Sequence, residues 1–138
     1  KEHFRHVNTF GGNPVSCAAG MAVLDVIEKE RLLENTQRVG ARLRAGFDEL
    51  ARRYEAIGDV RGAGLFVGVE LVRDRESRAP AGDIAARLVN GLRERRILIS
   101  ASGPGGNVLK IRPPLVFSEA DADIFLAAVD EVLGGIVS

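Results

Sequence analysis

The sequence alternates between stretches with helical spacing of apolar residues and short stretches typical of strands, and this order limits the possible folds. Helical spacing begins at four positions: Val15, Leu33, Asp83 and Ser118. Four short apolar stretches between them favour strands: 57–60, 65–72, 97–100 and 108–112. The order helix, helix, strand, strand, helix, strand, strand, helix predicts an α+β fold. We expect a small, mostly antiparallel sheet covered by helices on one face.

The charge balance and the single cysteine narrow the class of protein. Lys and Arg together number 19, as do Asp and Glu, so the chain of 138 residues has no net charge. This argues against nucleic acid or a membrane surface as a partner. Cys17 cannot form an internal disulfide, and no apolar run approaches the ~20 residues of a membrane span. We therefore expect a cytoplasmic protein, with Cys17 in the core of a first helix that is buried nearly all round.

A turn suited to an anion precedes the first helix. Asn13 is a good N-cap, and Pro14 suits the first helical position. Thr9 places a hydroxyl just before a helix N-terminus, where amide groups and the helix dipole favour an anion. The alternative is that this segment simply starts the helix, but capping leaves residues 10–12 unexplained. The turn therefore indicates Thr9 as a phosphate contact.

The strand at 108–112 carries two cations on one face. Period-2 alternation puts Lys110 and Arg112 opposite Leu109 and Ile111. Such a pair can receive an anionic substrate group, and Arg suits bidentate contact with a carboxylate or phosphate. The alternative is a solvated strand face with surface charges, which spacing alone favours.

Other motifs indicate less. The glycines at 62–64 precede a strand, whereas a dinucleotide-binding motif follows one, so we interpret them as tight-turn residues that allow close backbone approach. The loop 103–107 is either an anion nest or, as its composition favours, a mobile connection. His3 and His6 are too isolated to indicate a metal site or a catalytic dyad, so we expect no metal.

Three motifs together carry a resemblance to a known family. They are HVNTFGGNP at 6–14, DVRGAGL at 59–65 and NVLKIRPPL at 107–115. In sequence, order and spacing the chain resembles the C-terminal part of a class III pyridoxal-phosphate-dependent aminotransferase. The resemblance implies a fold-type-I homodimer that binds pyridoxal phosphate and moves an amino group between an amine or amino acid and a keto acid.

The resemblance also implies roles for particular residues. The residue matching Thr9 contacts the cofactor phosphate of the neighbouring subunit. Lys110 stands where many members have an Arg that holds the substrate carboxylate, and Arg112 lies nearby at the strand end. The Lys brings the chain closer to phospho-lyases of the ethanolamine-phosphate type, which are one alternative. A non-enzymatic oligomerisation module is another.

The resemblance finally implies which catalytic groups we expect to lie elsewhere. The family's Schiff-base lysine, and the Asp that pairs with the pyridine nitrogen, precede the Thr motif, and only eight residues precede Thr9. We therefore expect no catalytic residue in this chain and no activity from it alone. The expected organisation is a cofactor-contacting segment at 1–14, a long helical connection at 15–54 and a small α+β domain at 55–138.

Overall fold

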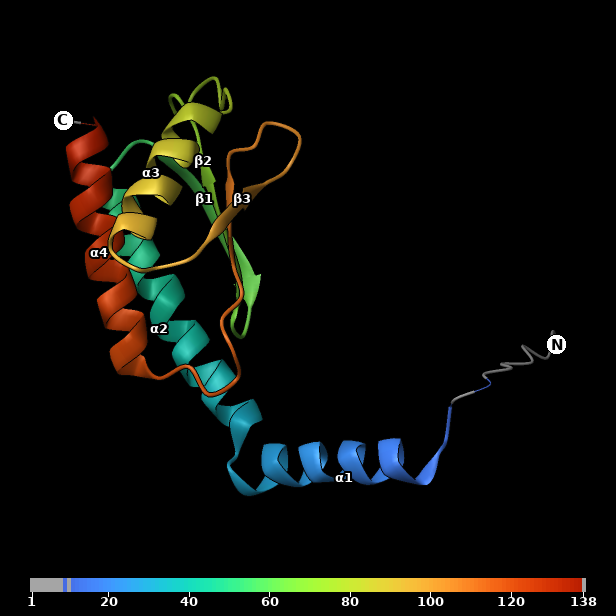
Figure 1. Cartoon of the computed structure of the whole chain (residues 1–138). Coiled ribbons are helices and arrows are strands. Elements are labelled where there is room, and N and C mark those ends of the chain that lie inside the picture. Colours follow the sequence, from blue (N-terminus) through green and yellow to red (C-terminus); the bar gives the residue numbers. More distant parts are fainter. Residues whose placement is uncertain (1–8, 10, 138) are drawn as a thin grey trace, which may run out of the picture. The chain divides into compact units, whose positions relative to one another are not determined.

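The computed structural model describes residues 9 and 11–137, and it divides the chain into two compact units, Lys1–Leu33 and Glu34–Ser138. The elements are α1 (Pro14–Lys29), α2 (Leu32–Arg53), β1 (Ile57–Ala63), β2 (Phe66–Leu71), α3 (Gly82–Glu94), β3 (Ser100–Ser102), β4 (Val108–Ile111) and α4 (Glu119–Val137) (Figure 1). Their type and order are those predicted from the sequence. No helix in this part of the chain combines the length and apolar character needed to cross a membrane.

The first unit contains α1, which begins as predicted. The Asn13 side-chain oxygen accepts a hydrogen bond from the Ser16 backbone N–H at 2.9 Å, and Pro14 occupies the first turn. None of the residues of α1 is buried, and Cys17 is exposed. The expectation of a core cysteine in a nearly enclosed helix is therefore wrong. Among the described residues of this unit α1 is the only complete element, so no second helix or sheet covers it there.

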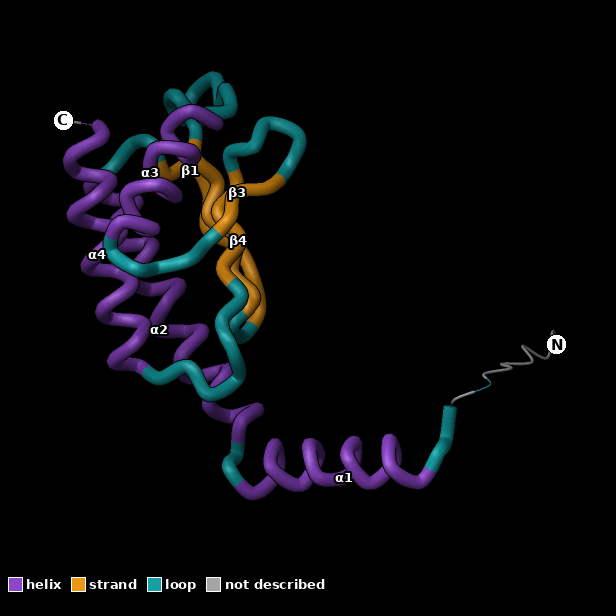
Figure 2. The backbone as a smooth tube through the Cα atoms, in the orientation of Figure 1, coloured by secondary structure: helices purple, strands orange, loops and turns teal. Residues whose placement is uncertain are grey.

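The second unit is a four-stranded sheet with helices on one face. Its strand order is β1-β2-β4-β3, and every neighbouring pair is antiparallel. Figure 2 shows the strands of this sheet gathered beside the helices of the unit. From Glu34 onward α2 lies with α3 and α4 on the same side of the sheet (Figure 1). The core lies between these helices and the sheet, and its fully buried side chains include Phe47, Leu88, Val67, Leu109 and Leu133. This confirms the predicted fold class.

Alternation along the two central strands agrees with the sequence prediction. The buried side chains are Val67, Val69 and Leu71 on β2, with Leu109 and Ile111 on β4. Because successive side chains point to opposite faces, Gly68 and Lys110 lie on the face away from the helices. This outward face of the sheet carries the candidate site.

Two strands differ from their predicted bounds by more than one residue at an end. β1 continues to Ala63, so the predicted turn at 61–64 is in part a paired strand, and Gly62 pairs with Val67. Gly62 and Gly64 have positive φ values of 149° and 52°. A Cβ on Gly62 would overlap the Phe66 carbonyl oxygen, which confirms that glycine here allows close backbone approach.

The third strand covers Ser100–Ser102 and not 97–100, because pairing begins at Ser100 opposite Lys110. Ile97 and Ile99 pack against the core without strand partners. Their apolar character therefore reflects burial beside the core and not membership of the sheet.

Two helix starts show which local signals are reliable. Ser118 and Asp121 form a capping box at α4: the Ser118 hydroxyl accepts from the Asp121 N–H at 3.2 Å, and the Asp121 carboxylate accepts from the Ser118 N–H at 2.9 Å. At α3 the cap is Ala81, with no side-chain cap bond. Asp83 is the second residue of α3 and pairs with Arg73 at 2.6 Å, so the helix begins one residue before the start at Asp83 that the sequence predicts.

Candidate functional site

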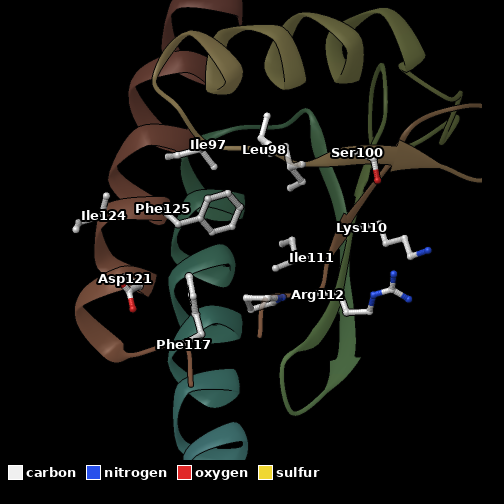
Figure 3. Close-up of a pocket in the computed structure, with 12 residues that line it drawn as sticks. Ile97, Leu98, Ser100, Lys110, Ile111, Arg112, Phe117, Asp121, Ile124 and Phe125 are labelled. Atoms are coloured by element: carbon white, nitrogen blue, oxygen red, sulfur yellow. The ribbon is translucent and has the colours of Figure 1, made fainter. Parts of the chain in front are cut away.

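Lys110 occupies the centre of the outward sheet face. Its cross-strand partners are Gly68 on β2 and Ser100 on β3. The side chain of Lys110 is half-buried, and Arg112, just beyond β4, is exposed. Figure 3 shows both side chains pointing away from Ile111, which packs into the core. The structure therefore brings the two predicted cations together on one face.

These two cations differ from the other cation on the same face. Arg61 on β1 pairs with Asp59 at 2.6 Å and with Glu70 at 2.7 Å. The hydrogen bonds that Arg61 donates raise the pKa of its guanidinium above the ordinary value, with the bond to Asp59 as the larger cause and the bond to Glu70 as the next. Within residues 9 and 11–137, neither the Lys110 side chain nor the Arg112 side chain has a hydrogen-bond or ion-pair partner. Their charges are therefore available to an anion, whereas that of Arg61 is already neutralised.

The segment that follows Arg112 is fastened to α2. Asn35 donates from its side-chain amide to the Leu115 carbonyl at 2.9 Å and to the Phe117 carbonyl at 3.0 Å. Arg38 in turn donates to the Asn35 side-chain oxygen at 2.9 Å. Sequence reasoning missed Asn35, because only the fold shows that the first turn of α2 lies beside residues 115–117. This contact fixes the path of the chain at the end of the cation-bearing strand.

A cavity of about 540 Å³ lies where β3 and β4 separate. Apolar side chains line most of it, among them Ile97, Ile99, Ile111, Phe117 and Phe125. Lys110 and Arg112 also contribute to the lining, but both side chains are directed away from Phe125 (Figure 3). The cations therefore belong to the open sheet face, and the apolar hollow lies on the other side of β4.

Asp121, an acidic member of this lining, is already engaged. The hydroxyl and backbone N–H of Ser118 donate to its carboxylate and lower its pKa. Among the described residues no group of three or more His, Cys, Asp or Glu side chains could hold a metal ion.

Thr9 lies in the first unit, where it forms a bend and is exposed. The rest of its motif includes His6 and Phe10, which lie outside the described residues. Gly12 has a φ of 76°, and Asn13 then caps α1. An exposed hydroxyl ahead of a capped helix start is a donor that suits a phosphate group.

The glycine loop before β4 is exposed at residues 103–106, and its last residue is anchored. Asn107 is buried, and its side-chain amide donates to the Leu71 carbonyl at 2.8 Å. A Cβ on Gly105 would lie 2.6 Å from the Pro80 Cβ, so this loop lies directly against the segment that leads into α3. The loop supports the start of β4 and hence the strand that carries Lys110.

Comparison with known proteins identifies relatives along nearly the whole chain. The family model for class-III aminotransferases matches residues 2–133. Alanine–glyoxylate aminotransferase 2 homolog 2, mitochondrial, of Arabidopsis thaliana is 48% identical over 125 residues, which cover 91% of this chain and 26% of that protein.

Two solved structures are also similar. A phospholyase from Arthrobacter in complex with phosphoethanolamine is 43% identical with a TM-score of 0.88, over 94% of this chain and 31% of that one. An amine transaminase from an uncultivated Pseudomonas species, in its PLP-bound form, is 33% identical with a TM-score of 0.83, over 98% of this chain and 30% of that one. The chain thus spans between 26% and 31% of the length of these relatives.

Proposed function

The chain belongs to the class-III aminotransferase family, and from that premise we propose that it is the C-terminal portion of an enzyme that transfers an amino group between an amine or amino acid and a keto acid. Pyridoxal phosphate is the cofactor of this family. When bound, it supplies the electron sink for bond changes at the amine carbon. The residues of this chain bind and orient the cofactor and the substrate, and the covalent anchor of the cofactor lies elsewhere in the enzyme.

Thr9 is the proposed contact to the cofactor. Its hydroxyl donates to the cofactor phosphate of the neighbouring subunit, so the active enzyme is a homodimer. The support is chemical, since Thr9 is exposed and lies just ahead of the capped N-terminus of α1. Such a position favours an anion because of the free amide groups and the helix dipole.

The observation that carries the proposal for the substrate is the pair of unpartnered cations on the outward sheet face. Lys110 binds the anionic group of the substrate, and Arg112 lies at the rim of the same site. A half-buried cation without a partner in the described part of the chain has its hydrogen-bonding capacity free for a ligand. As a compact charge, Lys110 imposes less geometry on an anion than the planar fork of an Arg would.

A phospho-lyase is the second candidate function, and Lys110 favours it. A flexible ammonium accommodates a phosphate as well as a carboxylate. The similar Arthrobacter enzyme was solved with phosphoethanolamine. In this reaction phosphate would leave the substrate, water would release the amino group as ammonia, and an aldehyde would remain, so no keto acid would be needed.

Product analysis of the full-length enzyme tests both candidates. Purified enzyme is supplied with pyridoxal phosphate and an amine substrate, with and without a keto acid. Turnover that requires the keto acid and converts it to an amino acid supports the aminotransferase. Release of inorganic phosphate from phosphoethanolamine without a keto acid supports the phospho-lyase. Turnover of neither kind would leave a non-enzymatic oligomerisation module as the explanation.

The isolated chain of 138 residues provides the companion experiment. We expect no turnover from it with pyridoxal phosphate, an amine and a keto acid, because the family's anchoring lysine is expected upstream. Turnover together with a stoichiometric lysine adduct would overturn this.

We also propose a cytoplasmic location, and an organisation into a cofactor-contacting segment at 1–14, a long helical connection at 15–54 and a small α+β domain at 55–138. Fractionation tests the location, since the Arabidopsis relative is mitochondrial by name.

A further inference from the structure

Gly68 lies in a row of cross-strand partners on the outward sheet face. Antiparallel pairing sets it opposite Arg61 on β1 and opposite Lys110 on β4, and Ser100 on β3 continues the row. In this row Gly68 has no side chain, whereas its neighbours carry a guanidinium, an ammonium and a hydroxyl. The sheet face therefore has a notch in its middle, with the backbone of β2 as its floor.

The fold does not require glycine at this position. Gly68 does not have a positive φ, unlike Gly62 and Gly64 in the adjoining turn. A Cβ on Gly68 would lie 3.5 Å from Val108 Cγ1 and 3.8 Å from Arg61 Cγ, which are ordinary contacts. Glycine inside a strand weakens the strand and often marks a place where a ligand approaches closely. The missing side chain is thus not explained by backbone geometry or by crowding.

The charges around the notch favour an anion at one side of it. Arg61 is held by Asp59 and Glu70, so that side is neutralised. On the other side the Lys110 side chain has no partner among the described residues. An anionic group that enters the notch would therefore meet the Lys110 ammonium.

We propose that Gly68 is a specificity-determining residue, because its missing side chain lets the anionic end of the substrate, a carboxylate or a phosphate, reach Lys110 Nζ across the bare backbone of β2. The inference rests on the proposed function, in which Lys110 binds that anionic group. A side chain at position 68 would occupy the approach and screen the ammonium.

Two substitutions in the full-length enzyme test this inference. Gly68→Ala fits without a clash, and Gly68→Val fills more of the notch with a residue that favours strands. For Gly68→Val we expect KM to rise about tenfold for an ω-amino acid and for phosphoethanolamine, because the substrate would lose one charge-assisted hydrogen bond. For Gly68→Ala we expect a smaller rise in KM. Neither kcat nor the KM for an uncharged amine should change. The melting temperature of both variants should be equal to or above that of the wild type.

Gly135→Ala in α4 is the matched control, since a Cβ there has nothing within 4 Å. It should leave every KM unchanged. A rise confined to the carboxylate substrate, or to the phosphate substrate, supports the inference and identifies the anion. A KM that rises for Lys110→Ala but not for the Gly68 variants overturns the inference about Gly68 and leaves the role of Lys110 standing. An unchanged KM in all of them overturns the role of Lys110 as well. A fall in kcat and melting temperature for charged and uncharged substrates alike would assign Gly68 to structure and overturn the inference.

Discussion

Asn35 donates a hydrogen bond of 2.9 Å from its side-chain amide to the backbone carbonyl of Leu115, 80 residues later in the chain. The same amide also reaches the Phe117 carbonyl at 3.0 Å. One side chain in the first turn of α2 thus satisfies two carbonyls of the irregular segment between β4 and α4. The segment begins at Arg112, so this contact fixes its path just beyond the end of the cation-bearing strand.

Asn35→Ala should lower the free energy of unfolding by about 0.5–1.5 kcal/mol, because the Leu115 and Phe117 carbonyls lose a common donor but stay partly accessible to water. Urea denaturation of the chain measures the difference. Gln37→Ala is the control, since Gln37 is an exposed residue of the same helix. Equal stability of the wild type and Asn35→Ala would show that water replaces the amide without cost.

Asp130 should make the stability of the chain depend on pH in the acid range. The Tyr54 hydroxyl donates to its carboxylate at 2.6 Å and Arg53 pairs with it at 2.7 Å, and together they lower the pKa of Asp130. Because the folded pKa lies below the unfolded value of about 3.9, this stabilisation is complete above that value and is lost as the pH falls through the folded pKa.

Unfolding free energies measured between about pH 2 and 7 test this, since ordinary carboxyls titrate in that range. Asp130→Asn should be less stable than the wild type at neutral pH, and the difference should shrink as the pH falls. Tyr54→Phe should reduce the acid sensitivity, because it removes the largest cause of the lowered pKa. A difference between wild type and Asp130→Asn that is constant with pH would contradict the prediction.

Patterns that act over a few residues could be predicted from the sequence. Alternation placed Lys110 and Arg112 opposite Ile111, and the helical pattern from Ser118 predicted the start of α4 at Glu119 to within one residue. Both depend on geometry repeated within one turn or along one strand. The fold class followed from the order of these local patterns.

Contacts between distant segments could not be predicted in this way. Nothing near Asn35 in the sequence indicates that its partners lie at residues 115–117. An apolar pattern also does not predict which element packs against it. Ile97 and Ile99 pack beside the core without joining the sheet. Cys17 lies in an apolar helix and is exposed. The missing information in each case is the identity of the packing partner.

The apolar surface of α1 should make the chain self-associate. Its exposed apolar side chains are Val15, Met21, Val23, Leu24 and Val26. Exposed apolar surface of this extent usually marks an interface. Sedimentation velocity should show association that increases with concentration and that Leu24→Glu reduces. Leu98→Glu, at an exposed apolar residue outside α1, is the control. A monomer at all concentrations would contradict this.

Thr9→Ala in the full-length enzyme should weaken the binding of pyridoxal phosphate. The hydroxyl is proposed to donate a charge-assisted hydrogen bond worth about 1.5–3 kcal/mol, so the affinity should fall roughly tenfold or more. Equilibrium dialysis of the apoenzyme measures this. Thermal unfolding without the cofactor should be unchanged, because Asn13 and not Thr9 caps α1. Ser77→Ala, which removes an exposed hydroxyl in the second unit, is the control. Equal affinity in the Thr9 variant would remove Thr9 from the site.

Lys110→Arg in the full-length enzyme should change the choice of substrate. The planar fork of Arg favours bidentate contact with a carboxylate, so kcat/KM should rise for carboxylate substrates and fall for the others. Lys110→Ala should raise KM about tenfold for any anionic substrate, as expected for the loss of one charge-assisted hydrogen bond. A panel of amino acids, phosphoethanolamine and uncharged amines, run on the wild type and both variants, measures the profile.

Arg61→Lys is the matched control for the Lys110 variants, because Arg61 lies on the same sheet face but is already paired with Asp59 and Glu70. It should alter stability without altering the substrate profile. If the wild type and both Lys110 variants share one profile, Lys110 is only a solvated charge on a strand face. If Arg61→Lys shifts the profile as strongly as the Lys110 variants do, the preference does not come from a contact at Lys110 alone. A shift confined to the Lys110 variants therefore identifies a direct contact between Lys110 and the anionic group of the substrate.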